Sequence, residues 1–141
     1  MTVPGLVPAG DVAGGYRTEM VGAPGCRVVT VVDGDTLNIA CRTGGLQSVR
    51  LLGYDSPEIF SPTCWSEHWR GWRATWRLRY LLWSADNLVL EFTGEDRFDR
   101  RLARMRVNGL SVATHMIRAG DARAYDGGRR LGWCDNDGGR L

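Results

Sequence analysis

The feature that most constrains the fold of this chain is the segment CRVVTVVDGDTLNIAC, which runs from Cys26 to Cys41. Two runs rich in β-branched residues stand on either side of Asp33 and Gly34, a dipeptide typical of a two-residue hairpin turn. Counting outward from this turn places Cys26 opposite Cys41. Directly opposed residues of an antiparallel pair are close enough for a disulfide, so we predict a Cys26–Cys41 bond.

The same register assigns one face of the hairpin to the core, because side chains alternate between the two faces of a strand. Asp35 stands at the open end of that face. By elimination, Cys64 and Cys134 form a second candidate disulfide. No two cysteines are spaced as a CxxC pair, which argues against a structural zinc site. The residues expected on the core face are Cys26, Val28, Val32, Leu37, Ile39 and Cys41.

The chain of 141 residues divides into one folded region and two terminal segments. Residues 1–25 are rich in Gly, Pro and Ala without periodicity, which predicts a flexible arm, and residues 135–141 predict a disordered tail. Residues 26–134 form a single predicted domain. Beyond the hairpin, we expect strands at 48–54, 87–93 and 101–107 and helices at 65–83 and 111–119. This order is α+β, and five short strands suit a closed OB-like barrel.

The predicted helix at 65–83 carries two nearly opposite stripes of side chains. A helix that lies on a barrel buries one face, so we expect the N-terminal arm or a second copy of the chain to cover the aromatic stripe. Two alternatives are that the tryptophans stack on nucleic acid, or that they face the barrel themselves. The small and aliphatic stripe is Cys64, Gly71, Ala74, Leu78 and Leu82, and the aromatic one is Trp65, Trp69, Trp72, Trp76, Tyr80 and Trp83.

Charge and hydropathy exclude several classes of protein. The formal net charge of +2 is too small for a uniformly basic nucleic-acid coat, although a local basic groove remains compatible with it. No apolar run is long enough for a membrane span, so we expect no membrane partner. The N-terminal residues lack the pattern of a secretory signal, which leaves a cytoplasmic location open, but paired cysteines favour an extracytoplasmic one.

Acidic residues cluster at two predicted strand ends, DGDT at 33–36 and DSPE at 55–58. Each motif alone is typical of a turn, but together they place several carboxylates at one barrel mouth. Crowded carboxylates favour a bound cation, and hard oxygen ligands suit Ca²⁺ or Mg²⁺. Arg50 and Arg100 add two guanidinium groups that can hold an anion beside the metal. This combination suits phosphodiester hydrolysis, with ordinary surface salt bridges as the alternative.

An ordered set of segments in this chain resembles the staphylococcal nuclease (thermonuclease) family. The set is VVDGDTLNI, VRLLGYDSPE, DRFDRRLARM and IRAGDARAYDGGRRLGWC, and the resemblance extends over residues 26–134. It implies a five-stranded OB-fold barrel with two main helices and calcium-dependent cleavage of DNA and RNA. The family's further C-terminal helix has no counterpart in the short tail, so we expect that helix to be absent.

The resemblance also implies a role for each matching residue. Asp35 and Asp55 would bind Ca²⁺ through their carboxylates, and Ser56, where the family usually has Thr, would bind it through its backbone carbonyl. Glu58 would orient or deprotonate the attacking water. The remaining roles are those of Arg50 and Arg100, which would hold the scissile phosphate, and of Tyr125, which would contact the nucleotide.

Two departures from the family pattern affect these expectations. Asp99 stands directly before Arg100 where the family commonly has Gly, so it would strain the turn or neutralise part of the Arg100 charge. Asp121 follows Gly120 where an apolar residue is usual. A non-catalytic OB-fold module that binds nucleic acid or protein is the alternative function, but such modules usually lack several catalytic positions, and this chain retains the full set of side-chain types.

Overall fold

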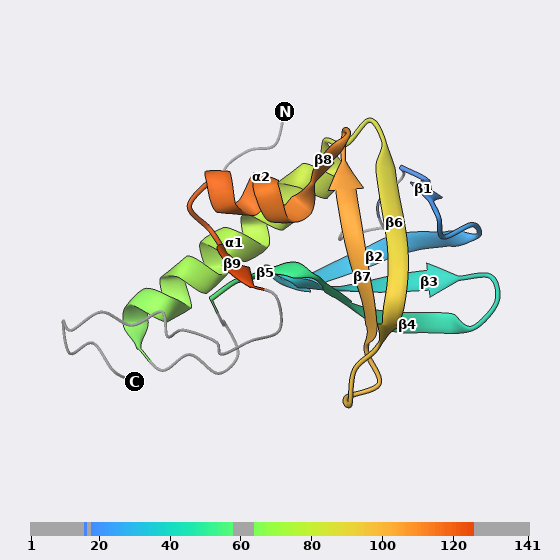
Figure 1. The fold of residues 1–141 in the computed structure, drawn as a ribbon, viewed down its shortest axis with the longest axis horizontal. Helices are drawn as coiled ribbons and strands as arrows, with labels where there is room; N and C mark the ends of the chain where they lie inside the picture. Colours follow the sequence, from blue (N-terminus) through green and yellow to red (C-terminus); the bar gives the residue numbers. More distant parts are fainter. Residues whose placement is uncertain (1–15, 17, 58–63, 126–141) are drawn as a thin grey trace.

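The computed structural model describes residues 16, 18–57 and 64–125. Figure 1 shows a curved sheet with two helices on one side of it. In chain order, the elements are β1 (Met20–Val21), β2 (Cys26–Asp33), β3 (Thr36–Cys41), β4 (Gly45–Leu51), β5 (Gly53–Asp55), α1 (Trp65–Trp83), β6 (Leu88–Glu95), β7 (Arg101–Val107), β8 (Leu110–Ser111), α2 (Val112–Arg118) and β9 (Arg123–Tyr125).

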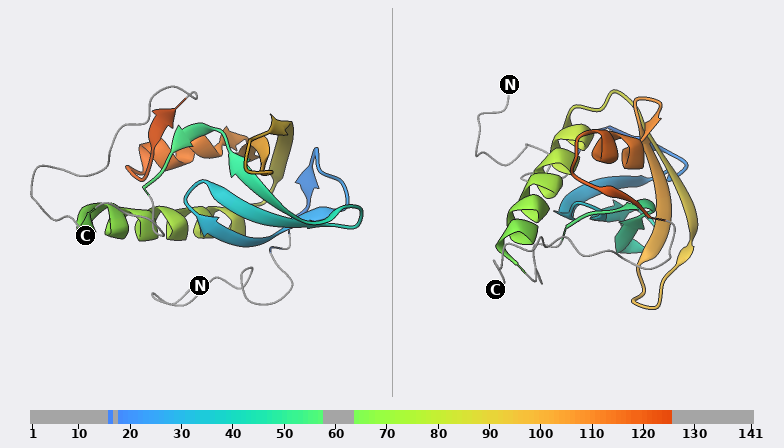
Figure 2. Two further views of the ribbon diagram at one scale, coloured as in Figure 1. Left: turned by 90° about the horizontal axis from the view of Figure 1, so that it is seen from below. Right: turned by 60° about the vertical axis from the view of Figure 1, so that its left-hand side comes forward.

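The main sheet is mixed and follows the order β1-β6-β7-β4-β3-β2, with β8 paired to β7. Most pairs are antiparallel, but β4 pairs with β7 and β1 pairs with β6 in parallel. The sheet curls into a half-barrel, and α1 and α2 pack inside the curve against β2 and β7, respectively (Figure 2). A second, two-stranded sheet of β5 and β9 lies beside α2. The prediction of an α+β, OB-like fold with two main helices is therefore confirmed.

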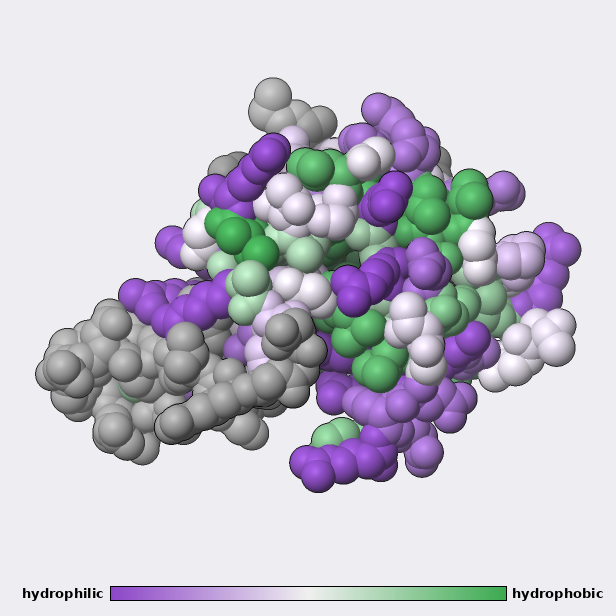
Figure 3. Space-filling model, viewed as in Figure 1, coloured by the Kyte–Doolittle hydropathy of each residue, from purple (hydrophilic) through white to green (hydrophobic). Residues whose placement is uncertain are grey.

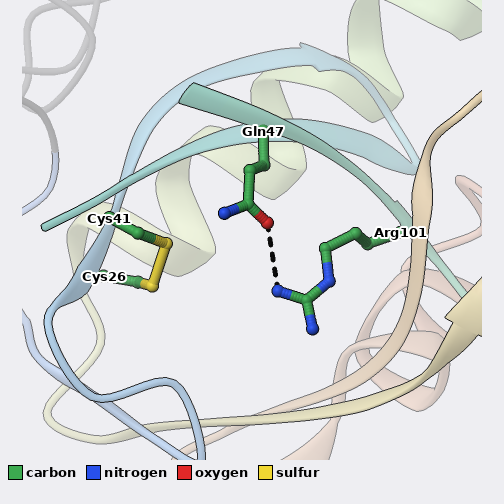
Figure 4. Close-up of a disulfide and its surroundings, with 4 residues drawn as sticks. All are labelled: Cys26, Cys41, Gln47 and Arg101. Atoms are coloured by element: carbon green, nitrogen blue, oxygen red, sulfur yellow. Dashed lines mark hydrogen bonds between the residues drawn. A yellow bond between two sulfur atoms is a disulfide. The ribbon is translucent and has the colours of Figure 1, made fainter. Parts of the chain in front are cut away.

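The first hairpin confirms the predicted disulfide and corrects the register near the turn. Cys26 pairs with Cys41, and their sulfur atoms are 2.03 Å apart (Figure 4). Two bulges in β2 then shift the pairing, so that Asp33 pairs with Thr36 and the turn consists of Gly34 and Asp35. A bulge reverses the alternation of side chains beyond it. The prediction that Val32 points into the core was therefore wrong, and the neighbouring Val31 is the buried residue.

Helix α1 has the bounds that the sequence predicted and buries its small and aliphatic stripe. The Cys64 sulfur caps the helix by accepting a hydrogen bond from the Glu67 N–H at 3.4 Å. Ala74, Leu78 and Leu82 are fully buried in the core. The alternative in which the tryptophans face the barrel was therefore wrong, because the narrow side chains allow the helix to approach the sheet closely.

Part of the predicted N-terminal arm belongs to the folded domain. Met20 and Val21 form β1 on the edge of β6, and Tyr16 is almost completely buried. The Tyr16 N–H donates a 2.8 Å hydrogen bond to the Val28 carbonyl, which ties this segment to β2. Gly22 lets the chain approach β6, since a Cβ at that position would lie 2.1 Å from the Leu90 carbonyl oxygen. The sequence did not reveal this docking because the segment has no hydrophobic periodicity.

Several predictions concern residues outside the described ones. Glu58, Cys134, the tail at 135–141 and the expected absence of a C-terminal helix all belong to this group. None of the described cysteines is a free thiol, but the pairing of Cys64 with Cys134 stays a prediction. Within residues 16, 18–57 and 64–125, no helix is long and apolar enough to cross a membrane.

Candidate metal and phosphate site

The candidate site begins at the β2–β3 turn, which places Asp35 in a buried position. The Asp35 side chain is 4% exposed, and its backbone N–H donates to the Asp33 carboxylate at 3.1 Å. The Thr36 hydroxyl donates to one oxygen of Asp35 at 3.2 Å, and the Ser56 N–H donates to the other at 3.3 Å. Asp33 therefore forms the turn, as expected, while Asp35 faces the end of β5.

Arg50 connects the two predicted metal-binding carboxylates. Its Nη1 lies 2.6 Å from an oxygen of Asp35, and its Nη2 lies 3.8 Å from an oxygen of Asp55. Nη2 also donates to the Tyr54 carbonyl at 3.3 Å. Both carboxylates and the guanidinium are largely buried, so their charges interact with little screening by solvent.

The electrostatics of this cluster are dominated by burial and excess negative charge. Burial raises the pKa of Asp35 to about 7, and the charges of Asp33 and Asp55 add to the rise. The Arg50 guanidinium opposes it. One guanidinium therefore does not compensate fully for the carboxylates around it, and a second cation at this position would relieve their repulsion.

The turn and β5 are braced against each other by Tyr54. Its hydroxyl donates a 2.7 Å hydrogen bond to the Gly34 carbonyl, and burial raises the pKa of this phenol well above its usual value, so it remains a donor. Gly34 is required by close packing, since a Cβ there would lie 2.7 Å from the Ser56 side chain and 2.8 Å from Ala74. The sequence did not single out Tyr54, although it lies inside the quoted VRLLGYDSPE segment.

Arg100 is held by an acidic residue that the sequence analysis overlooked. Its Nε donates to Asp96 at 2.8 Å, and the other Asp96 oxygen accepts from the backbone N–H groups of Phe98 and Arg100, both at 2.9 Å. Partial burial works to raise the pKa of Asp96, but these hydrogen bonds lower it below its ordinary value. Asp99 has a φ of 62°, in the left-handed region, so it strains this turn as expected. The described ion pair of Arg100 is formed by Asp96 rather than Asp99.

The predicted phosphate-binding and nucleotide-binding residues line one cavity of about 800 Å³. Arg50 and Arg100 lie in its wall together with Tyr125, which comes from β9. Leu52 and Leu102 add apolar surface to the same wall. Because Arg50 also contacts both buried carboxylates, the cavity and the carboxylate cluster form one continuous site.

The donor set of this site fits a hard divalent cation. Asp35, Asp55 and the backbone carbonyl of Ser56 would supply oxygen ligands of the kind that Ca²⁺ prefers. Among residues 16, 18–57 and 64–125, no group of three His, Cys, Asp or Glu side chains has a metal-binding arrangement. Water and substrate oxygens would therefore have to complete the coordination, which is common for Ca²⁺ and Mg²⁺.

A family model described as staphylococcal nuclease homologue matches residues 48–131, which is more than half of the chain. The chain belongs to the staphylococcal nuclease family. The match includes the positions of Arg50, Asp55 and Arg100. Asp35 precedes the matched residues, and its place in the site rests on its contact with Arg50. No curated protein matches the chain.

Outside this nuclease-family site, Asp121 is a buried acidic residue at the position where the family usually has an apolar one. Its carboxylate is fully buried and accepts hydrogen bonds from two arginines of α1, Arg73 at 2.6 Å and Arg77 at 3.0 Å. The Arg73 guanidinium also donates to the Gly120 carbonyl at 3.4 Å. These contacts fasten the end of α2 to α1 and compensate for burying the charge.

The aromatic side of α1 is exposed to solvent. Its solvent-accessible members form a ridge in which the ring of His68 makes edge-on contacts with three tryptophans. The described part of the chain leaves this ridge uncovered. The exposed residues are Trp65, Trp69, Trp72, Tyr80 and Trp83, while Trp76 is half-buried under Arg79.

Proposed function

We propose that this protein is a calcium-dependent phosphodiesterase that hydrolyses DNA or RNA with low sequence specificity. The observation that carries the proposal is the contact of one buried arginine, Arg50, with both Asp35 and Asp55 at the wall of a cavity that Arg100 and Tyr125 share. Ordinary surface salt bridges do not bury two carboxylates against one guanidinium. The membership of the nuclease family supports the same class of reaction.

Each residue of the site would have a separate role in the reaction. Asp35, Asp55 and the Ser56 carbonyl would hold the metal, which when bound offsets negative charge on the phosphate oxygens. Arg50 and Arg100 would bind those oxygens through their planar guanidinium groups. Glu58 would take the proton of the attacking water.

The positions of these groups would favour charge stabilisation over covalent catalysis. Asp96 fixes the Arg100 side chain before substrate binds, and Asp35 and Tyr54 do the same for Arg50. Donors that are already oriented stabilise a transition state more strongly than mobile ones, because they need no reorganisation. Tyr125 and the two leucines of the cavity wall would contact the sugar and base without selecting a sequence.

A non-catalytic OB-fold module that binds nucleic acid or protein is the alternative. The exposed aromatic ridge of α1 favours it, because such a surface suits a partner. The same ridge would explain a homodimer, in which a second copy of the chain covers Trp65, Trp69, Trp72 and Trp76. A monomeric hydrodynamic radius at all accessible concentrations would contradict the homodimer.

The first experiment is hydrolysis of a fluorescent single-stranded DNA oligonucleotide with Ca²⁺, with Mg²⁺ and with EDTA. The wild type is compared with Glu58→Gln and with a matched control, Glu19→Gln, whose side chain is exposed. We expect Ca²⁺-dependent cleavage that falls more than about 10²-fold in Glu58→Gln, since a general base contributes about 10²–10⁴. Binding without cleavage by any metal-loaded wild type would favour the module instead.

A location outside the cytoplasm is also proposed. The Cys26–Cys41 disulfide supports it, because such bonds persist in oxidising compartments and are rare in the cytosol. Fractionation of cells that express the full-length protein would test this location, and recovery only in the cytosolic fraction would contradict it.

A further inference from the structure

Arg104, on the exposed face of β7, has no role in the function described so far. Its side chain forms no hydrogen bond or ion pair with any residue that the structure describes. Glu91 is its cross-strand neighbour on β6, but the two side chains form no ion pair. A buried or paired arginine would need no ligand, whereas this one is available to bind an anion.

The Arg104 side chain extends toward the candidate site. Its Nη1 would lie 3.7 Å from a Cβ placed on Gly53, so the guanidinium passes over the start of β5. Arg104 lines the same cavity as Arg50 and Arg100. It also lines a neighbouring hollow of about 210 Å³, together with Arg106 and Ser111. Arg104 therefore stands where the two depressions meet.

The strand register gives the spacing of Arg104 and Arg106 relative to Arg50. Arg50 on β4 is paired with Leu102 on β7, and Arg104 and Arg106 follow Leu102 two and four residues later. The intervening residues of β7, Ala103 and Met105, are buried, so these three positions share the outer face. Residues two apart on a strand are separated by about 6.6 Å. This step is comparable to the distance between successive phosphates of an extended single strand.

Hydrophilic side chains alternate with apolar ones on this part of the surface. Figure 3 shows the hydrophilic side chains at the β6–β7 turn, near the lower edge of the view, and again over the middle of β7. Arg100 follows that turn, and Arg104 lies further along the strand. The cationic positions thus continue along β7 in one direction from the place assigned to the scissile phosphate.

We propose that Arg104 binds the phosphate adjacent to the scissile one in a single-stranded nucleic-acid substrate, and that the strand then continues toward Arg106. This inference rests on the proposed function, because Arg50 and Arg100 define the scissile position. A guanidinium suits the contact because its planar donors match two phosphate oxygens at once. The contact is to the sugar–phosphate backbone and therefore adds affinity without sequence preference.

The test compares Arg104→Ala with Arg27→Ala, which removes an exposed arginine that lines a different cavity beside β1. Two substrates are used, a dinucleoside monophosphate with a single phosphate and a labelled hexanucleotide. We expect Arg104→Ala to lower kcat/KM for the hexanucleotide about 5- to 10-fold and to leave the dinucleoside monophosphate unchanged. Arg27→Ala should change neither substrate by more than about twofold, as expected for a surface residue.

A binding measurement in EDTA provides a second readout that does not depend on activity. Fluorescence anisotropy of the hexanucleotide at several salt concentrations should show a slope of log K against log salt that is about 0.7 smaller in Arg104→Ala, the value for one lost contact to a single strand. Arg104→Gln should behave in the same way, because it keeps much of the side-chain volume but loses the charge.

The outcomes separate this inference from the proposed function. Equal effects of Arg104→Ala and Arg27→Ala on the hexanucleotide would overturn it while leaving the nuclease intact. A similar loss with both substrates would also overturn it, because Arg104 would then act on the scissile phosphate. A wild type that binds the hexanucleotide without cleaving it would refute the nuclease, and the salt slope would still decide the role of Arg104. A wild type that neither binds nor cleaves would refute both.

Discussion

Two buried clusters of aspartate and arginine in this structure have opposite charge balance. At the candidate site, two carboxylates, Asp35 and Asp55, contact one guanidinium, that of Arg50. Between α1 and the end of α2, one carboxylate, Asp121, contacts two guanidinium groups. Among the described residues, the first cluster has an excess of negative charge, whereas the second has an excess of positive charge.

The arginine side chains of the two clusters also differ in their exposure to solvent. The Arg50 side chain is 12% exposed, whereas those of Arg73 and Arg77 are 60% and 45% exposed. Water can therefore stabilise the surplus charge around Asp121, but it has little access to the surplus around Asp35. The cluster around Asp121 is therefore complete as it stands, whereas the cluster around Asp35 would gain stability from an added cation. This difference separates a structural ion cluster from one suited to metal and phosphate.

The largest expected effect comes from exchanging an arginine for lysine in each cluster. Arg50→Lys should lower kcat/KM for DNA hydrolysis by about 10² or more, because a point charge cannot replace a planar guanidinium that serves two carboxylates and a phosphate. Arg73→Lys, the matched control, should stay within about twofold of the wild type. Equal activity of the two variants would remove the functional distinction between the clusters.

Removing the carboxylate at position 121 should affect stability rather than catalysis. Asp121→Ala loses hydrogen bonds from both arginines, so we expect the free energy of unfolding to fall by about 2 kcal/mol. Asp121→Leu should lose less, because an apolar residue fills the site and the exposed arginines return to water. Urea denaturation measures both variants, and a larger loss for Asp121→Leu would contradict this account.

The raised pKa of Asp35 predicts a pH-dependent effect of Asp35→Asn on stability. Because burial raises this pKa from 3.8 to about 7, the folded protein binds more protons than the unfolded one between these values. The contribution of Asp35 to stability therefore falls as pH rises through this window. In EDTA, the free energy of unfolding of Asp35→Asn relative to the wild type should be higher at pH 8 than at pH 5.

Between pH 5 and pH 8 this relative free energy should rise by about 2 kcal/mol, since about two pH units separate pH 5 from the pKa of about 7 and one pKa unit corresponds to about 1.4 kcal/mol. Thermal and urea unfolding at both pH values measure it. If the free energy of unfolding of Asp35→Asn relative to the wild type were the same at both pH values, the ionised Asp35 carboxylate would not destabilise the folded protein.

The smallest effect is expected at Asp99, an exposed carboxylate beside Arg100 that belongs to neither cluster. Asp99→Gly relieves a φ of 62°, so we expect the protein to gain about 0.5 kcal/mol of stability. Hydrolysis should change by less than about twofold, because Asp96, not Asp99, holds Arg100. A large gain in activity would instead show that Asp99 neutralises the phosphate-binding arginine.

Much of the candidate site was predictable because its residues lie close together in short segments. The segment from Arg50 to Ser56 runs from the end of one strand through the next, and the hairpin brings Asp35 alongside. The roles of Asp96 and Arg104 were not predictable in this way. Asp96 holds Arg100 through a turn whose hydrogen bonds depend on backbone angles, and Arg104 reaches the cavity wall across Gly53, which is distant in the sequence.

The sequence by itself determined the local structure of this protein. Hydrophobic period and turn residues placed α1 at Trp65–Trp83 and β7 at Arg101–Val107 and predicted the hairpin of β2 and β3, whereas the pairing of Cys26 with Cys41 also needed the two bulges that offset a turn one residue later than predicted. These elements depend on interactions between residues that are close in the sequence, so the sequence pattern predicts them directly.

Only the tertiary structure decided the rest. The bulges in β2 put Val31 rather than Val32 into the core, and the sheet packs against the narrow stripe of α1 rather than its tryptophans. It also brought Asp121 to Arg73 and Arg77, more than 40 residues away. Each of these depends on the shape and charge of a surface that forms when distant segments meet, and no local pattern contains that information.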